Sequence, residues 1–462
     1  MKTFIRMTGF NHDSLARHLF PGDGCEAAAL LVCGRREGND VTVLTVRRVI
    51  PIPYECCSVR TPVCVQWSTE TLDDFMAEIW KSSASVIKVH SHPTGFNRFS
   101  DLDDASDGEL STSFDCLWEE GRMHASAVLL PNGRIFARTL QHGRIGPFVD
   151  AIMVVGDDID IFRGSESKSG REDDRRNRQA FGEGTISMLK ALRVAVIGCS
   201  GTGSVVIEQL ARLGVGAFVL VDPDHVESKN LNRIVNATAK DAEFEVPKVE
   251  VMRRMIQSLG RGQEVIPLKT NLDDPDAVRR VAECDAIFGC VDGAEGRNLA
   301  NRIAAYYVQP YIDVGVSLAA DGVGGISTVA GAVNYYAPGH QSLIERGAIT
   351  QEQISAEELK RTNPERYEQL KRQKYIQGVD ENRPAVISVN MFFAALAVNE
   401  FLARIHRFRN MSNGECGIIR GDLCESALFR EPGQGSTGHL FKEIGLGDQL
   451  PLLGRSSLSE RQ

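Results

Sequence analysis

The sequence predicts an α/β protein in two parts, a mixed α/β domain followed by a domain built on a parallel sheet. Its 462 residues exceed the size of one average domain. Residues 1–150 contain short, alternating apolar runs, whereas the later sequence alternates buried strands with helices. We therefore predict domains at 1–150 and 177–410, a linker at 151–176 and a C-terminal extension at 411–462.

Three local patterns support the first domain. The runs "AAALLVCG" and "VTVLTVRRV" predict strands, and "TETLDDFMAEIWKSS" predicts a helix. The segment "ASAVLLPNGRIFARTL" predicts two strands, because Asn132-Gly133 favours a hairpin turn. Residues 163–178 are highly charged and lack large apolar side chains, as is typical of a solvated linker. We expect residues 448–462 to form a frayed tail.

The composition limits the partners and the compartment. The formal net charge of −9 argues against nucleic acid as the main partner. No run is long and apolar enough to span a bilayer, and residues 1–13 lack the apolar stretch of a secretory signal. The 11 cysteines include no C-x-x-C pair, which indicates a reducing, cytoplasmic setting with mostly buried free thiols.

A histidine pair lies in the stretch "VIKVHSHPTGFNRFSDLDD". His90 and His92 alternate, so on a strand both side chains face the same side. A helix beginning near Asp103 would bring a third ligand to the same ion. Three such ligands with one position left for water are the composition of a catalytic zinc site, where Ser100 could donate a hydrogen bond to an oxyanion. The alternative is two surface histidines beside a Ser/Asp helix cap, which a bare H-x-H favours and the full H-x-H-P-x6-S-x-x-D pattern disfavours.

This pattern resembles the JAMM, or MPN, metalloproteases, which remove ubiquitin and ubiquitin-like proteins. The motif H-x-H-x7-S-x-x-D matches at all four positions. The family also has a glutamate that opens a strand ending in glycine, and "CEAAALLVCG" offers Glu26 and Gly34 for that pattern. The resemblance implies that Glu26 is the general base and Ser100 the oxyanion helper. It implies three zinc ligands, His90, His92 and Asp103.

A glycine-rich turn opens the second domain. The stretch "LRVAVIGCSGTGSVVIEQLARLGVGAFVLVDPD" predicts the β-α-β unit of a Rossmann-like domain. Its turn contains Gly198, Gly201 and Gly203, and favours the approach of a phosphate to backbone amides. Asp222, at the end of the next strand, fits a ribose-binding acid. A nicotinamide-dependent dehydrogenase explains these features equally well.

The residues that follow favour attack on an α-phosphate over hydride transfer. The stretch "VDPDHVESKNLNRI" gathers acids, amides and Arg233, "VPKVE" adds Lys248, and "GCVDGAEGR" adds Asp292 and Arg297. A hydride-transfer enzyme needs no such collection of cations and Mg²⁺-binding acids. We therefore expect Arg233 and Lys248 to neutralise the triphosphate of ATP and Asp292 to hold Mg²⁺.

The order and spacing of these residues resemble the ubiquitin-activating superfamily, and most closely the ThiF-type bacterial enzymes that adenylate sulfur-carrier proteins. The similarity runs from about residue 175 to 405. In that family an Asn-Arg-Gln segment precedes the first strand and its arginine reaches ATP in the partner subunit, so Arg178 implies a homodimer. The resemblance implies a nucleotide site made of Gly198, Gly201, Gly203, Asp222, Asp224, Asn230, Arg233, Lys248 and Asp292.

The chain departs from that family in three respects. Ser200 replaces a glycine of the turn, and Gly339 and Ser342 stand where a first C-x-x-C pair would fall, so we expect no structural zinc. The crossover region lacks a cysteine for a thioester, which leaves direct transfer of the acyl-adenylate or an ester on a hydroxyl such as Ser342. Four cysteines are interpreted as buried structural thiols: Cys199, Cys290, Cys416 and Cys424.

Two later segments predict helices. The charged stretch "ITQEQISAEELKRTNPERYEQLKRQKYIQ" has a helical pattern and indicates either a solvated helix pair or a mobile crossover that covers the site. The stretch "PAVISVNMFFAALAVNEFLARI" predicts a long apolar helix for core packing or a dimer contact.

These patterns lead to three functional hypotheses. The first is a bifunctional enzyme with a zinc (iso)peptidase that cleaves after the C-terminus of a ubiquitin-like modifier and an ATP- and Mg²⁺-dependent site that adenylates the same carboxylate. Bacterial ubiquitin-like systems, some in antiphage defence, contain such combinations, and a conjugating-enzyme partner would follow. The second is sulfur-carrier activation for cofactor or siderophore assembly. The third is a non-catalytic scaffold that binds ubiquitin-like folds.

Overall fold

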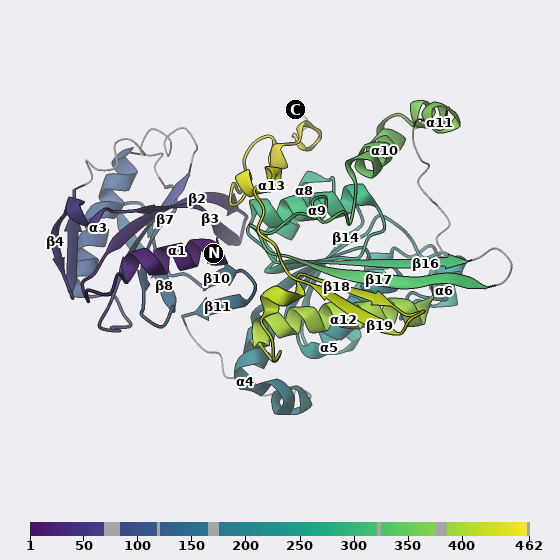
Figure 1. Cartoon of the computed structure of the whole chain (residues 1–462), viewed down its shortest axis with the longest axis horizontal. Coiled ribbons are helices and arrows are strands. Elements are labelled where there is room, and N and C mark those ends of the chain that lie inside the picture. The colour runs from purple at the N-terminus through teal and green to yellow at the C-terminus, as the bar shows by residue number, and fades with distance from the viewer. Residues whose placement is uncertain are drawn as a thin grey trace. The chain divides into compact units, whose positions relative to one another are not determined.

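The computed structural model describes residues 1–68, 84–117, 121–164, 175–320, 325–373, 375 and 386–459 (Figure 1). The helix expected at 69–83 lies outside these residues. The chain forms two compact units. Unit 1 contains residues 1–166, 306–308 and 443–450, and unit 2 contains residues 167–305, 309–442 and 451–462. Each unit has helices packed on a sheet, so the predicted α/β fold class is confirmed.

Unit 1 is built on a mixed sheet. Over the described residues its strand order is β11-β10-β1-β3-β2-β6-β7-β8-β9. The strands are β1 (Lys2–Thr8), β2 (Ala28–Glu37), β3 (Val41–Pro51), β6 (Ser85–Ser91), β7 (His124–Leu129), β8 (Ile135–Gln141), β9 (Arg144–Phe148), β10 (Ala151–Val155) and β11 (Ile159–Arg163). β7 and β8 form the predicted antiparallel hairpin. A separate hairpin pairs β4 (Cys57–Thr61) with β5 (Cys64–Trp67), after the short 3₁₀ helix η1 (Tyr54–Cys56).

Helices α1 (Gly9–Leu19) and α3 (Asp101–Leu117) cover opposite faces of this sheet. Leu31 of β2 belongs to the hydrophobic core under α1, whereas its neighbour Leu30 belongs to the core under α3. Val89 of β6 belongs to the α1 core. Because side chains alternate along a strand, His90 faces α3.

The linker predicted to start at residue 151 and the frayed tail predicted at 448–462 both contain ordered structure. Residues 151–163, predicted as linker, form β10 and β11, and all five residues of β10 are buried where it pairs with β1. The charged composition starts only at residue 163, so the apolar run before it belongs to the sheet. The tail expected to fray contains two 3₁₀ helices, η6 (Leu452–Gly454) and η7 (Ser456–Leu458), whose leucines are buried.

A segment from the C-terminal extension completes unit 1. Residues 443–450 lie against β2, where Gly34 donates a backbone hydrogen bond of 3.1 Å to the carbonyl of Gly445. Asp448 donates another, of 2.7 Å, to the carbonyl of Arg35. A Cβ atom at residue 34 would lie 2.3 Å from the oxygen of residue 445, so this close approach requires glycine.

Unit 2 is built on a sheet with the strand order β14-β13-β12-β15-β16-β17-β18-β19 over the described residues. The strands are β12 (Arg193–Ile197), β13 (Ala217–Val221), β14 (Glu264–Leu268), β15 (Ala286–Gly289), β16 (Tyr311–Ala320), β17 (Ile326–Tyr336), β18 (Ile418–Asp422) and β19 (Ala427–Glu431). β12 to β16 are parallel and the rest antiparallel. The chain passes from β12 to β13 and β14, then returns to β15 on the other side of β12, so a topological switch point lies between β12 and β15.

The helices of unit 2 connect or cover these strands. They are α4 (Arg175–Ala191), α5 (Gly201–Leu213), α6 (Ala239–Glu243), α7 (Lys248–Ser258), α8 (Pro275–Ala282), α9 (Ala294–Tyr306), α10 (Gln351–Thr362), α11 (Pro364–Arg372), α12 (Ile387–His406) and α13 (His439–Lys442), with the 3₁₀ helices η4 (Ser228–Asn230) and η5 (Asn413–Cys416). α10 and α11 are the predicted charged helix pair.

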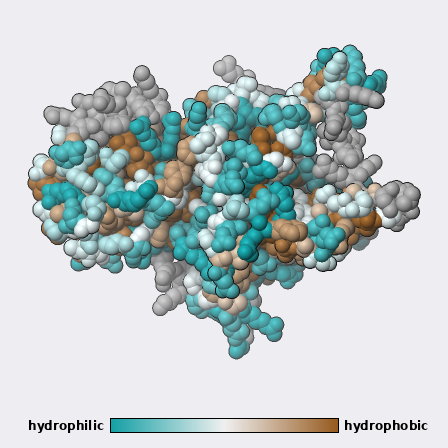
Figure 2. Space-filling view, viewed as in Figure 1, coloured by the Kyte–Doolittle hydropathy of each residue, from teal (hydrophilic) through white to brown (hydrophobic). Residues whose placement is uncertain are grey.

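The long apolar helix predicted near the C-terminus is α12, which packs against α5, β16 and β17. Among the described residues it alone has the length and hydropathy to cross a membrane, and 61% of that stretch is buried inside the protein, as in the core helix of a globular unit. Met391 and Phe392 on α12 and Leu428 and Phe429 on β19 are exposed. Figure 2 shows hydrophobic side chains at the surface in this part of unit 2.

Candidate metal and nucleotide sites

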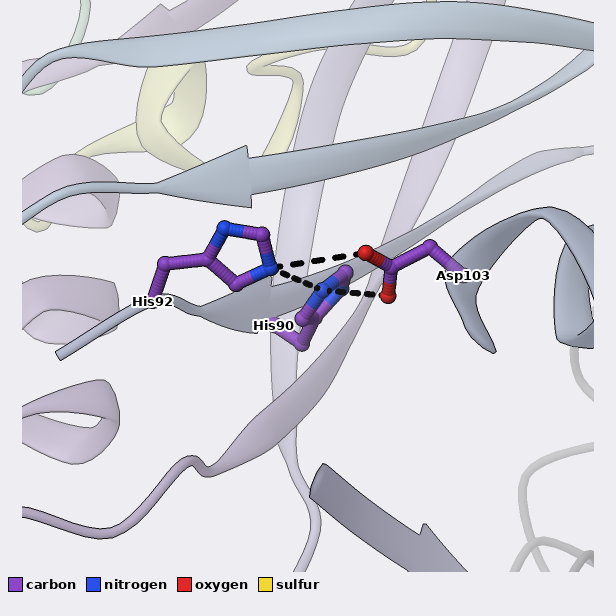
Figure 3. Close-up of side chains that lie close together, drawn as sticks. All are labelled: His90, His92 and Asp103. Atoms are coloured by element: carbon purple, nitrogen blue, oxygen red, sulfur yellow. Dashed lines mark hydrogen bonds and ion pairs between the residues drawn. The ribbon is translucent and has the colours of Figure 1, made fainter. Parts of the chain in front are cut away.

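His90, His92 and Asp103 converge on one point in unit 1 (Figure 3). Nε2 of His90 lies 2.8 Å from Oδ1 of Asp103 and 3.1 Å from Nε2 of His92. Nε2 of His92 lies 3.5 Å from Oδ2 of Asp103. Within the part of the chain that the structure describes, this is the one group of three or more His, Cys, Asp or Glu residues whose ligand atoms all lie within 4.8 Å of one another. The spacing of these three residues in the sequence had predicted that their side chains would meet.

Local structure places each member of this group. His90 is near the end of β6, His92 follows that strand directly, and Asp103 is in the first turn of α3. Ser100 caps α3, because its Oγ accepts a 3.2 Å hydrogen bond from the N–H of Asp103. Oδ2 of Asp103 in turn accepts hydrogen bonds of 2.7 Å from the N–H and the Oγ–H of Ser100. The helix cap that was the alternative interpretation is therefore present beside the cluster. The role of Ser100 toward an oxyanion stays a prediction.

The donor atoms fit a divalent cation. Nδ1 of His92 lies 2.7 Å from the carbonyl oxygen of Phe96, so Nδ1 carries the proton and Nε2 turns its lone pair toward the cluster. Burial lowers the pKa of His90, which keeps that ring neutral at pH 7. Burial opposes ionisation of Asp103, but its close approach to both histidines outweighs this effect and holds its pKa well below the usual range. The pKa of His92 is raised, because burial is outweighed by Asp103, the carbonyl of Phe96 and Glu26. Two imidazoles and one carboxylate are a ligand set that zinc prefers.

Glu26 lies beside this cluster. Its Oε1 is 3.9 Å from Nε2 of His92, because β2 pairs with β6 and places Ala28 opposite His90. Its backbone N–H donates a 2.8 Å hydrogen bond to Thr61 at the end of β4. Burial raises the pKa of Glu26 to about 7. A carboxyl group with a pKa near neutral pH is suited to accept and release a proton.

In unit 2 the glycine turn lies at the switch point. Gly198 directly follows β12 with φ of 90°, and a Cβ there would lie 2.6 Å from the carbonyl oxygen of Cys290, just beyond β15. A Cβ on Gly203 would lie 1.8 Å from the oxygen of Gly198. The turn is therefore held too tightly for side chains at these positions, and α5 begins within it. The resulting helix N-terminus favours an anion.

Two acids and a lysine border this turn at the end of β13. Asp222 is buried and accepts hydrogen bonds from the N–H groups of Cys199 (2.7 Å) and Asp224 (2.9 Å). Nζ of Lys248 lies 2.7 Å from Oδ2 of Asp224 and 4.0 Å from Oδ1 of Asp222. Burial raises the pKa of Asp222, and the charge of Lys248 opposes this effect. The predicted residues therefore form one connected group.

Arg233 and Asn230 follow this group along the chain. The side chain of Arg233 passes next to the turn, since a Cβ on Gly201 would lie 3.2 Å from its Cδ. Its Nη1 donates a 2.9 Å hydrogen bond to the carbonyl of Lys229. Asn230 is buried, and its Oδ1 accepts a 3.0 Å hydrogen bond from the N–H of Glu227. The phosphate roles expected for Arg233 and Asn230 stay predictions.

On the other side of the turn, Asp292 is exposed in the loop between β15 and α9. Arg297, counted among the cations of the site, forms a two-point ion pair with buried Asp313 at 2.8 and 2.5 Å. Its guanidinium is thus already paired with a buried carboxylate. Sequence reasoning missed Glu357 of α10, whose carboxylate accepts hydrogen bonds of 3.0 and 2.8 Å from the first two N–H groups of α9. No local pattern marks this residue, because its partners are distant in the sequence.

The remaining predicted groups lie elsewhere in unit 2. Arg178 is on α4, where Nη1 is 3.5 Å from Oε1 of Glu183. Ser342 is buried and donates a 2.8 Å hydrogen bond to Glu345. Cys199, Cys290 and Cys416 are buried, but Cys424 is exposed, contrary to the prediction, because it lies in the turn between β18 and β19. The expectation of mostly buried thiols was also too strong, since six of the 11 cysteines are at least partly exposed.

Together, the parallel sheet, the glycine turn at its switch point and the adjoining acids and cations define a nucleotide-binding α/β domain. A model of the ThiF family matches residues 174–419, more than half of the 462 residues. The chain therefore belongs to the ThiF family.

Several characterised proteins share part of this domain. The chain is 42% identical to the tRNA threonylcarbamoyladenosine dehydratase of Bacillus subtilis over 94 residues, which are 20% of this chain and 36% of that protein. It is 34% identical to the molybdopterin-synthase adenylyltransferase of Escherichia coli over 113 residues, 24% of this chain and 45% of that protein. It is 32% identical to the SAMP-activating enzyme E1 of Haloferax volcanii over 124 residues, 27% of this chain and 45% of that protein. The chain thus matches less than half of the length of each relative.

Proposed function

We propose that the protein acts on the carboxyl-terminal tail of a ubiquitin-like protein through two sites. Unit 1 would hydrolyse the amide or isopeptide bond that follows this tail, and unit 2 would adenylate the freed carboxylate with ATP. The convergence of His90, His92 and Asp103 beside Glu26 carries the first half of the proposal. Membership of the ThiF family and the residues around the glycine turn support the second half.

In unit 1, the histidine–aspartate cluster would hold a zinc ion, which supplies Lewis acidity toward the scissile carbonyl when bound. Glu26 would accept a proton from the attacking water and deliver it to the departing amine. Its carboxylate is close enough to face the same substrate, yet it stands outside the three-residue group. The Oγ–H of Ser100, which binds Asp103 in this structure, would turn to the oxyanion, while the N–H of Ser100 keeps Asp103 oriented.

In unit 2, an oxygen of the tail carboxylate would attack the α-phosphorus of ATP, forming an acyl-adenylate and releasing pyrophosphate. Lys248, which pairs with Asp224 in this structure, would exchange that partner for a phosphate. Arg233 and the amides of the turn would stabilise the remaining phosphate charge, Asp222 would hold the ribose, and Asp292 would hold Mg²⁺. A cytoplasmic homodimer with Arg178 reaching the partner's nucleotide, and a conjugating-enzyme partner, belong to the same proposal.

One assay tests both halves. The full chain would be mixed with Zn²⁺, Mg²⁺, ATP and ubiquitin-like proteins, supplied in separate reactions with an extended tail for cleavage and with a free tail carboxylate for adenylation. Mass spectrometry would then record tail cleavage, and exchange of labelled pyrophosphate into ATP would record adenylation. We expect His92→Ala to abolish cleavage and leave exchange intact, and Lys248→Ala to lower exchange by about 10²- to 10³-fold and leave cleavage intact. Wild-type protein that supports neither reaction and binds no zinc would instead indicate the scaffold.

Activation of a sulfur carrier is the second candidate function. It is favoured by the likeness to a protein named molybdopterin-synthase adenylyltransferase. The two candidates share the adenylate and differ in its fate. With sulfide added to the assay, the second case would give a carrier thiocarboxylate as sulfide displaces AMP, whereas a covalent adduct with an amine of another protein would indicate conjugation.

A further inference from the structure

A buried ion-pair cluster lies one helical turn from the candidate metal ligands. Asp107 of α3 is fully buried, and its Oδ1 lies 2.5 Å from Nζ of Lys88. Its Oδ2 accepts hydrogen bonds of 2.9 and 2.6 Å from Nε and Nη2 of Arg138 on β8. Lys88 and Arg138 are each only 7% exposed. We call these three residues the Asp107 cluster.

The cluster repeats the spacing of the metal ligands on the same two elements. Lys88 precedes His90 by two residues on β6, so both side chains face α3. Asp107 follows Asp103 by four residues on α3, so both face β6. Two strand residues span ~6.6 Å and four helix residues ~6 Å. The pairs Lys88–Asp107 and His90–Asp103 are therefore two neighbouring rungs between one strand and one helix.

Rigidity of the metal site requires more than the helix cap. The hydrogen bonds between Ser100 and Asp103 fix the carboxylate relative to its own helix, but they do not fix its position relative to β6. The Asp107 cluster supplies that second constraint. A shift of α3 along β6 would leave Lys88 and Arg138 charged and unpaired in the interior, which is strongly unfavourable. Arg138 binds one carboxylate oxygen of Asp107 through two donors and Lys88 lies against the other oxygen, so the two cations together fix its orientation.

Arg138 extends the same constraint to the start of α3. Its guanidinium lies 3.8 Å from the ring centroid of Phe99, the residue before Ser100. It also pairs with Asp104, the residue after Asp103. One cation thus contacts the chain on both sides of the segment that carries the cap and the carboxylate ligand.

We propose that Lys88, Asp107 and Arg138 are positioning residues that set the register of α3 against β6 and so hold Asp103 at coordinating distance from His90 and His92. This inference rests on the metal site of the proposed function and is independent of what the site hydrolyses. It predicts that the Asp107 cluster controls zinc affinity, although none of its members is a ligand.

The test measures zinc binding by the full chain in competition with a chromophoric chelator, together with the visible spectrum of the Co²⁺-loaded protein. We expect Lys88→Met and Asp107→Asn to weaken zinc binding by about 10- to 100-fold, the range seen for groups that orient metal ligands, and to change the Co²⁺ spectrum. Lys88→Arg, which keeps the charge, should restore most of the affinity. Arg138→Lys keeps the charge but loses the two-point contact, and should give an intermediate loss of zinc affinity. It provides the test if the other variants fold poorly.

The matched control is Arg36→Met, which removes the 3.1 Å ion pair between Arg36 and Asp448 in the same unit. It should lower the melting temperature and leave zinc affinity unchanged. The inference is overturned if folded Lys88→Met, Asp107→Asn and Arg138→Lys behave like this control. Zinc binding by wild-type protein that cleaves no tail would defeat the proposed peptidase and leave this test intact, whereas wild-type protein that binds no zinc would defeat both.

Discussion

Nδ1 of His92 lies 2.7 Å from the carbonyl oxygen of Phe96, and this contact turns Nε2 toward His90 and Asp103. The ring is therefore oriented by a backbone atom four residues further along the chain. A backbone carbonyl that fixes the tautomer of a histidine is a common partner of metal-binding imidazoles.

We expect His92→Ala to remove zinc from the protein, because two remaining ligands cannot hold the ion in competition with a chelator. Elemental analysis should give about one zinc per chain for wild type and none for the variant. His142→Asn is the matched control. His142 has φ of 53°, a conformation that Asn tolerates, so that variant should keep its zinc. Equal metal content in both variants would remove His92 from the site.

Glu26→Gln should keep the metal and lose the hydrolysis. The amide resembles the carboxylate in shape but cannot take up the proton, so tail cleavage should fall by about 10²- to 10⁴-fold. Zinc content and pyrophosphate exchange should match wild type. Cleavage within tenfold of wild type would assign the proton transfer to another group.

The raised pKa of Glu26 predicts a specific pH dependence for protein stripped of metal. Burial raises this pKa from 4.5 to about 7, so the folded state binds the proton more tightly than the unfolded state. Stability from this group is complete below pH 4.5 and is lost as the pH rises through 7. In the presence of a chelator, wild type and Glu26→Gln should melt together at low pH, and wild type should melt at lower temperature at high pH. If the difference in melting temperature between the two proteins stayed constant across this pH range, folding would not raise the pKa of Glu26.

Adenylation should depend on the groups beside the glycine turn. Lys248→Ala and Asp292→Asn each remove a charge expected to act on the phosphates, so pyrophosphate exchange should fall by about 10²- to 10³-fold. Lys240→Ala, which changes an exposed lysine of α6, is the control and should leave exchange intact. Tail cleavage should be unaffected in all three variants. Exchange that survives both active-site changes would place the nucleotide elsewhere.

Gly34→Ala should destabilise unit 1. The new Cβ would lie 2.3 Å from the carbonyl oxygen of Gly445 and 2.4 Å from the backbone of Leu446, so the segment must move, at a cost of about 1–3 kcal/mol. Gly108→Ala on α3 is the control. A Cβ there meets no atom within 4 Å, and alanine favours the helix by ~1 kcal/mol. Chemical denaturation should therefore shift in opposite directions for the two variants.

The convergence of His90, His92 and Asp103 was predictable because its pattern is local. Alternation along one strand places His90 and His92 on one side, and a Ser-x-x-Asp cap marks the helix that brings Asp103. Glu26 came from family resemblance alone, since its approach to His92 depends on the pairing of β2 with β6, which no short pattern encodes.

Other features depend on contacts between distant parts of the chain. β10 and β11 were placed in the linker because their pairing with β1 is set by the topology of the sheet. Arg297 was counted as a free cation because its partner, Asp313, lies on the next strand. Lys88 and Asp107 did carry a signal, since they repeat the spacing of His90 and Asp103 on strand and helix. That signal is readable only once the two elements are known to face each other.

Unit 1 combines residues 1–166 with residues 443–450, which are synthesised much later. A ribosome that has made residue 166 must still add the chain up to residue 450 before β2 can bind its last neighbour. At ~5–20 residues per second this delay lasts roughly 15 to 55 seconds. Residues 1–166 are therefore made well before they can finish folding, and Gly34 and Arg35 lack these backbone partners during that time.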